Sequence, residues 1–315
     1  MQTLPTSPTH RPASLDLLTN VRFDAALNLH VGTLTIGTQQ VRVALRPGPT
    51  DARTPQAPAP LLLFNGIGAN LELVAPFLKA MPQCEVIVFD VPGAGQSPAP
   101  QWPYRLFSMA RLAAKLLDTL GYREVDVLGV SWGGGLAQQF AIQYPARVRR
   151  LVLAATAMGG VSMVPGRPQV LWKMLNPRRY VDRGYMRSIA ADIYGGSLRT
   201  NVDDIELFLS HAKGGNRRGY RYQMLAMMGW TSLPWLWRIR QPTLILAGDD
   251  DPLVPLINAR VQASIMRNAK LHVVNDGHLF LLTRAAEVAP VVLDFLMQAD
   301  AVAVAQPRKA ASAAL

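Results

Sequence analysis

A serine between glycines is the first feature of this sequence that could do chemistry. It lies in the stretch GVSWGGG, residues 129–135, which follows the apolar run EVDVL and precedes LAQQFAIQYP. A G-x-S-x-G turn between a strand and a helix lifts the serine hydroxyl above the sheet, and the turn is too tight for side chains at Gly129 and Gly133. Ser131 is therefore the candidate nucleophile of an acyl transfer.

The same glycine-rich turn has an alternative interpretation as a phosphate cradle at a helix N-terminus. A Walker-type loop would need Lys followed by Ser or Thr after its last glycine, and GGGLAQQ contains neither. The pattern favours the nucleophile.

A serine hydroxyl needs a base to take its proton. His278, in VNDGHLFLL, follows the last predicted strand and precedes the last predicted helix. We therefore predict that His278 is the base. The other histidines fall in an N-terminal tail, before an early hairpin, in a helical insert and inside a strand: His10, His30, His211 and His272.

The base needs an acid, and the strand end LILAGDDDPLVP offers three carboxylates. The usual spacing places the acid three residues after the glycine, which selects Asp251; Asp250 is the runner-up and Asp249 is less favoured. An acidic run here could also be a solvated turn or a cation site, and Asp276 is interpreted as a turn residue. The chain order Ser131, Asp251, His278 is the order expected for such a triad.

The oxyanion of the tetrahedral intermediate needs preorganised N–H donors. One predicted donor is the N–H of Trp132, directly after the nucleophile. The second is predicted in the glycine-containing stretch FNGIGAN, where Ile67 is favoured and Gly66 is the alternative. The other interpretation of this stretch is a plain glycine turn with no role in catalysis.

These residues require a scaffold of alternating strands and helices. The stretch HVGTLTIGTQQVRVALRPG predicts a β-hairpin, and nearly continuous apolar runs predict buried strands starting at Leu61, Cys84, Glu124 and Val148. The pattern resumes after residue 238. Strands alternating with helices predict a mostly parallel sheet with helices on both faces. Together with the G-x-S-x-G turn, this sheet predicts an α/β-hydrolase fold, with a helical lid inserted after a central strand.

Residues 158–238, the helical insert, interrupt that pattern and hold four of the six tryptophans. An ordinary helical cap with its own small core is one interpretation. The other is a lid that lines an apolar pocket. The predicted substrate-binding residues of such a lid are Trp172, Met228, Trp230, Trp235 and Trp237. The predicted division is a tail at 1–20, a core at 21–157 and 239–298 around the insert, and a tail at 299–315.

Composition narrows the class of protein. Half of the 315 residues are hydrophobic and 17% are charged, which predicts a globular chain. Cys84 is the only cysteine, so no intramolecular disulfide can form. No secretory signal or transmembrane run is apparent, which predicts a soluble cytoplasmic protein. The net charge of +11 comes with dispersed arginines and no nucleic-acid motif, so no nucleic-acid partner is expected.

The sequence resembles the intracellular medium-chain-length poly(3-hydroxyalkanoate) depolymerases from about residue 30 to 298. The resemblance is carried by PLLLFNGIGANLELVAPF, VIVFDVPGAGQS, GVSWGGGLAQQFA, YGG, MGWTSLPWLWRIRQPTLILAGDDDPLVPLINAR and DGHLFLLTRAAEVAP. It implies a serine esterase with Ser131, Asp251 and His278 as its triad and with no metal or other cofactor. It also implies a storage-polyester substrate and association with polyester granules.

The implied partners are a granule surface or an apolar ester substrate, and granule-associated proteins are candidates. We also expect Trp235 and Trp237 to support granule binding more than hydrolysis of a small ester. Two other functions stay open, namely a generic carboxylesterase or lipase-like enzyme and a granule-binding protein without catalysis.

Overall fold

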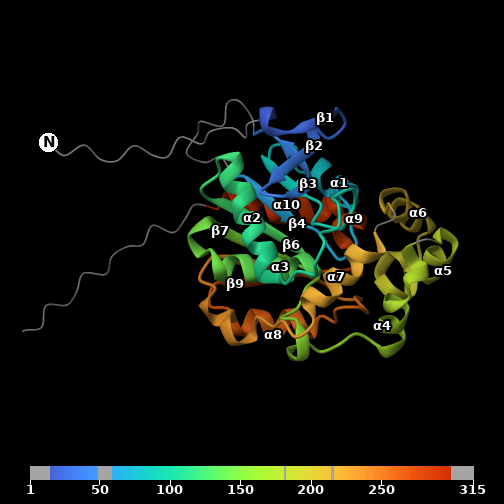
Figure 1. Ribbon diagram of the computed structural model, residues 1–315. Helices are drawn as coiled ribbons and strands as arrows, with labels where there is room; N and C mark the ends of the chain where they lie inside the picture. Colours follow the sequence, from blue (N-terminus) through green and yellow to red (C-terminus); the bar gives the residue numbers. More distant parts are fainter. Residues whose placement is uncertain (1–14, 49–58, 181, 214–215, 299–315) are drawn as a thin grey trace, which may run out of the picture.

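One sheet organises the chain (Figure 1), and the computed structural model describes residues 15–48, 59–180, 182–213 and 216–298. Within these ranges the strand order is β1-β2-β3-β5-β4-β6-β7-β8-β9. The first four strands in that order pair antiparallel and the others pair parallel, which confirms the mostly parallel sheet. The strands are β1 Thr19–Asp24, β2 Leu29–Ile36, β3 Gln39–Arg46, β4 Leu61–Phe64, β5 Val86–Phe89, β6 Val125–Val130, β7 Val148–Ala154, β8 Thr243–Gly248 and β9 Ala269–Val274.

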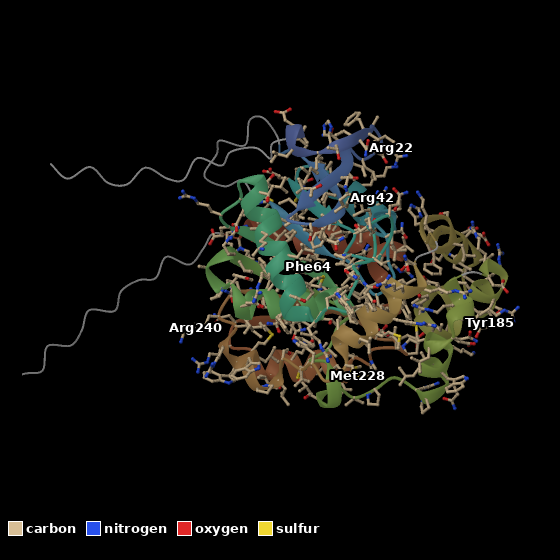
Figure 2. All side chains as sticks on the ribbon, in the orientation of Figure 1. Arg22, Arg42, Phe64, Tyr185, Met228 and Arg240 are labelled. Carbon is tan, nitrogen blue, oxygen red and sulfur yellow. The ribbon has the colours of Figure 1, made fainter. Side chains whose placement is uncertain are left out.

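Helices cover both faces because the central strands are apolar on both sides. One apolar core lies under α2 (Leu106–Leu120), α3 (Trp132–Gln143) and α8 (Ile257–Ile265). The other lies under α1 (Ala75–Lys79), α9 (Phe280–Thr283) and α10 (Ala285–Met297). Phe64 of β4 lies at the centre of the molecule (Figure 2), where its ring meets those of Phe89 and Phe140 edge to face.

The regular elements in the described part of the insert are all helical, and the insert leaves the sheet after β7. Its helices α4, α5 and α6 form a lobe beside the sheet, and α7 lies between that lobe and the core (Figure 1). The lobe has an apolar core of its own, which includes Ile193 and Phe208, and Leu282 of α9 joins it. The elements are η4 Gly160–Ser162, α4 Pro168–Leu175, η5 Pro177–Tyr180, α5 Arg183–Tyr194, η6 Gly196–Arg199, α6 Val202–His211, α7 Arg217–Met227 and η7 Leu233–Arg238.

The N-terminal part is more structured than the sequence pattern indicated. The predicted hairpin is confirmed as β2 and β3, which pair in continuous register. A short turn of helix, η1 (Leu15–Leu17), and the edge strand β1 also form, so regular structure begins before residue 20. Residues 1–14 and the stretch 299–315 lie outside the described residues. Within the described ranges, every helix is too short or too polar to cross a bilayer.

Candidate active site

Ser131 sits at the junction of β6 and α3 on a strained backbone. Its φ of 54° and ψ of −116° fall in a region that residues with a side chain rarely adopt. A Cβ at Gly129 would lie 2.4 Å from the carbonyl oxygen of Gly133, which confirms the collision expected across the turn. A Cβ at Gly133 would instead strike the end of β4, 2.2 Å from the carbonyl oxygen of Phe64. The elbow therefore needs both glycines, for two different contacts.

Backbone hydrogen bonds align the carboxyl ends of β6, β7, β8 and β9 along one edge of the sheet. The three candidate residues follow β6, β8 and β9, so all of them belong to this edge. The bonds run from Ser131 N–H to Ala154 O at 2.8 Å, from Ala155 N–H to Leu246 O at 2.9 Å and from Asp249 N–H to Val274 O at 3.0 Å.

His278 and Asp251 form a buried pair at this edge. The Nδ1 atom of His278 lies 2.6 Å from Oδ2 of Asp251, and both side chains are almost fully buried. Oδ1 of Asp251 accepts N–H bonds from Leu253 and Val254 at 2.9 and 2.8 Å. An ionised carboxylate only accepts hydrogen bonds, so it selects the tautomer with a proton on Nδ1 and leaves Nε2 free to act as a base.

The residue Tyr194, at the end of α5, holds His278 from the insert side. The backbone N–H of His278 donates to the carbonyl oxygen of Tyr194 at 2.7 Å, and the two rings stack with centroids 6.1 Å apart. Tyr194 is the first residue of YGG, which is part of the resemblance, but the sequence alone assigns no role to it.

Asp250 and Asp276 fasten the insert to the core instead of contacting the base. Asp250 accepts the N–H of Gly196 at 2.8 Å and pairs with Arg199 at 2.8 Å. Asp276 accepts the N–H of Ser197 at 2.7 Å, so it does more than close the turn predicted for it. Asp249 is exposed. Of these four carboxylates, Asp251 is the one that the structure places in a hydrogen bond with the imidazole of His278.

The loop after β4 lies beside the nucleophile. A Cβ built on Gly66 would be 3.7 Å from Cβ of Ser131, and the N–H of Gly66 already donates to the Asn65 side chain at 2.9 Å. In the described part of the chain, the N–H of Ile67 has no protein acceptor. Trp132 is the first residue of α3, so its N–H also has no acceptor within the helix. This arrangement favours Ile67 over Gly66 as the partner of Trp132.

Gln223 of α7 ties both sides of this donor pair to the insert. The side-chain oxygen of this fully buried residue accepts the N–H of Gly68 at 2.9 Å, and its backbone carbonyl oxygen accepts the indole N–H of Trp132 at 2.8 Å. The sequence carries no signal for this role, because a glutamine inside an amphipathic helix is unremarkable by pattern.

Asp90, at the end of β5, braces the same loop. Its carboxylate accepts the N–H of Leu71 at 2.9 Å and that of Gln96 at 3.0 Å. Burial raises the pKa of Asp90 to about 6, against the lowering effect of the Gln96 N–H and of Arg42. These hydrogen bonds give the turn DVPGAGQS a structural role.

Glu72 links the core to the end of α6. Its carboxylate binds Arg42 at 3.0 Å, Lys213 at 2.7 Å and Asn70 at 2.5 Å. Burial alone would raise the pKa of Glu72, but the hydrogen bonds from Arg42, Lys213 and Asn70 outweigh burial and hold this pKa well below its usual range. A depressed carboxyl pKa stabilises the fold above the unfolded value, and this stabilisation is lost as the pH falls toward the folded value.

We expect Glu72→Gln to lower the free energy of unfolding by about 1–3 kcal/mol at pH 7. The difference from the wild type should shrink as the pH falls below the ordinary glutamate value of 4.5, because the wild-type carboxylate then becomes protonated on unfolding. Urea unfolding at pH 7, 4.5 and 3.5 measures this. A difference that stays constant across this range would contradict the assignment.

The predicted lid residues are dispersed over the insert. Trp172 on α4 and Met228 after α7 are exposed, and Met228 lies at the periphery (Figure 2). Trp230 instead packs against Gly135 of α3, and its indole N–H donates to Gln139 at 2.8 Å. Trp230 therefore helps to seat the insert on the core.

Trp235 and Trp237 lie away from the site. Arg238 lies over both rings, at 5.2 and 5.1 Å, and Arg267, just before β9, lies 5.8 Å from the ring of Trp237. That position is at the amino ends of β8 and β9, whereas the candidate triad follows their carboxyl ends. The six-residue strand β8, roughly 17 Å long, separates the two edges. The expected substrate pocket therefore does not include these two tryptophans.

Comparison with known proteins places the chain in a family. The model of the alpha/beta hydrolase fold matches residues 59–285. The poly(3-hydroxyalkanoate) depolymerase of Ectopseudomonas oleovorans is 54% identical over 282 residues, which cover 88% of this chain and 96% of that protein. The 2-hydroxymuconate semialdehyde hydrolase of Pseudomonas sp. (strain CF600) is 30% identical and covers 85% of this chain and 96% of its own.

Solved structures agree on the fold. The enol-lactonase from Burkholderia xenovorans LB400 superposes with a TM-score of 0.72 at 21% identity, covering 84% of this chain and all of its own. The elbow serine, the sheet and the matched relatives agree, and the chain belongs to the alpha/beta hydrolase fold family, in the branch that contains the poly(3-hydroxyalkanoate) depolymerase of Ectopseudomonas oleovorans.

Proposed function

We propose that this protein is a serine hydrolase that cleaves the ester bonds of a poly(3-hydroxyalkanoate) to 3-hydroxy acids or oligomers. The observation that supports the assignment of the substrate is the 54% identity to the Ectopseudomonas oleovorans depolymerase, over 88% of this chain. The chemistry is supported by the strained Ser131 and by the His278–Asp251 pair at the same sheet edge.

In the first step, Nε2 of His278 accepts the hydroxyl proton while Oγ of Ser131 bonds to an ester carbonyl carbon. The N–H groups of Ile67 and Trp132 bind the resulting oxyanion, and Asp251 stabilises the imidazolium. The imidazolium then gives its proton to the departing alkoxy oxygen, so the bond between carbonyl carbon and ester oxygen breaks and an acyl-enzyme remains on Ser131.

In the second step, water takes the place of the alcohol. His278 accepts a proton from water as its oxygen bonds to the acyl carbon, and the same proton returns to Oγ of Ser131 when the acyl–Oγ bond breaks. The product is a 3-hydroxy acid or an oligomer with a new carboxylate end.

We further propose that the enzyme works in the cytoplasm at the granule surface, and that an exposed side chain of the insert contacts the polyester. Trp172 is the best candidate, since 77% of this residue is exposed on α4. Exposed aromatic residues on one side of a domain are suited to an apolar surface.

We expect Trp172→Ser to weaken binding to amorphous polyester granules about tenfold, while hydrolysis of p-nitrophenyl octanoate stays unchanged. The reason is that burying one large apolar side chain contributes about 1.5–3 kcal/mol to the binding free energy. Trp102→Ser is the matched control, since Trp102 is 73% exposed but lies on the core before α2. Granule co-sedimentation and initial rates measure both properties.

Equal loss in the two variants would contradict the role of Trp172. A wild type that cleaves the small ester but releases nothing from granules would point to the generic carboxylesterase. Granule binding without activity on either substrate would point to the non-catalytic alternative.

A further inference from the structure

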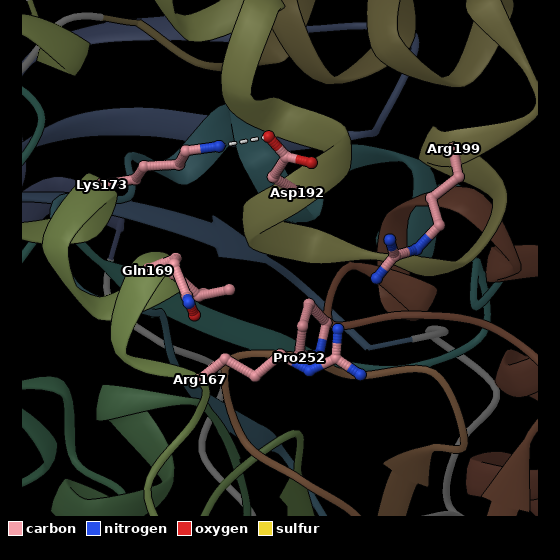
Figure 3. Close-up of a pocket in the computed structure, with 7 residues that line it drawn as sticks. Arg167, Gln169, Lys173, Asp192, Arg199 and Pro252 are labelled. Carbon is pink, nitrogen blue, oxygen red and sulfur yellow. Dashed lines mark hydrogen bonds and ion pairs between the residues drawn. The ribbon is translucent and has the colours of Figure 1, made fainter.

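A cavity lies between the insert and the loop that carries the triad acid (Figure 3). Its volume is about 310 Å³, and its walls come from α4, α5, η6 and the core loop after β8. Pro252, which lines it, directly follows Asp251 in the chain. A residue of the cavity wall is therefore the chain neighbour of Asp251, whose side chain is hydrogen-bonded to His278. Its charged lining consists of Arg167, Lys173, Arg199 and Asp192.

The charges of this cavity leave one cation unpaired. Lys173 pairs with Asp192, and Arg199 pairs with Asp250. Within the described ranges Arg167 has no carboxylate partner. The three lining cations, together with Asp192 of the lining and Asp250 outside it, give a local charge of +1, which matches one monocarboxylate ligand.

The two walls are fastened to the same core loop. A Cβ on Gly166 would lie 2.4 Å from the carbonyl oxygen of Pro252, so the chain entering α4 lies against the loop. Val164 is held by two hydrogen bonds to the Asn258 side chain, at 2.8 and 2.9 Å. On the other wall, Asp250 fixes Gly196 and Arg199. In Figure 3 the side chains of Arg167 and Arg199 extend from their opposite walls toward the loop at Pro252.

We propose that this cavity binds the carboxylate of a 3-hydroxyacyl unit, with Arg167 as its main ligand and Arg199 as a second donor. The proposal rests on the proposed function, because each ester cleavage creates such a carboxylate. A guanidinium binds a carboxylate through paired N–H donors, and Val170 and Pro252 offer apolar contact to the acyl stem. The ligand is either the carboxyl end of a polyester chain or the released acid, and both present the same group.

Direct binding to the Ser131→Ala protein tests this site without turnover. In calorimetric titrations, 3-hydroxyoctanoate should bind, and adding Arg167→Ala should weaken its affinity about tenfold or more, because a hydrogen bond to a charged group is lost. Methyl 3-hydroxyoctanoate should bind weakly and equally to both proteins. Arg221→Ala, which changes an exposed arginine of α7 that does not line the cavity, should have no effect.

A linear trimer with a free carboxyl end separates the two sources. Tighter binding of the trimer than of the monomer, lost with Arg167→Ala, assigns the cavity to the chain end; equal binding of both assigns it to the released acid. The proposal is overturned if the acid and its methyl ester bind alike, if Arg167→Ala changes neither, or if inorganic phosphate competes as well as the acid. These results stand apart from the polymer assignment, because an enzyme that fails on granules can still bind the acid.

Discussion

Replacing Ser131 by alanine is expected to lower kcat for p-nitrophenyl octanoate by a factor on the order of 10⁶, because no other group can form the acyl-enzyme. The fold should persist, since alanine keeps the Cβ that the elbow already accommodates at a φ of 54°. A fluorophosphonate probe should label the wild type and leave Ser131→Ala unlabelled.

Ser264→Ala is the matched control for this prediction, because Ser264 lies on α8 and its hydroxyl donates to the backbone carbonyl of Val261 in its own helix. It should keep the wild-type rate and labelling. If Ser131→Ala retained more than about one hundredth of the wild-type rate, the acyl-enzyme route through Ser131 would be excluded.

Replacing Asp251 by asparagine is expected to lower kcat about 10⁴-fold with little change in KM. The amide oxygen can still accept the N–H groups of Leu253 and Val254, so the NH₂ group turns toward Nδ1 of His278. The imidazole must then carry its proton on Nε2, where it cannot accept the proton of Ser131.

Asp250→Asn separates the acid from its neighbour. It weakens an exposed ion pair with Arg199, so we expect a change in kcat of about threefold or less. Rates and circular dichroism of both variants measure the contrast. Equal losses of activity in the two variants would refute Asp251 as the orienting acid.

Much of the sheet could be predicted because its strands rest on local patterns, and local patterns also led to the proposed triad. The apolar runs from Leu61 and Val148 form buried parallel strands, since such runs fit strands covered on both faces. The candidate base and acid follow from the rule that functional groups gather at the carboxyl ends of parallel strands. The acid could be chosen among adjacent aspartates only by spacing, and the hydrogen bond to His278 supports that choice.

The parts that could not be predicted lack a clear local pattern of apolar residues. Strand β1 has no buried residue, so it lacks the alternation that identifies a strand and forms by pairing with β2. The apolar character of Trp237 predicts a place in the pocket, yet its position shortly before β8 puts it at the amino ends of the strands. The close spacing between Trp237 and Thr243 was the signal that could have placed it.

The most direct test is the release of 3-hydroxy acids from amorphous medium-chain-length polyester granules by the wild type and by Ser131→Ala, measured by gas chromatography of the methyl esters. We expect steady release by the wild type and none above the buffer blank by the variant. Release that persists with Ser131→Ala, or its absence from a wild type that hydrolyses p-nitrophenyl octanoate, would contradict a serine-dependent polyester hydrolase.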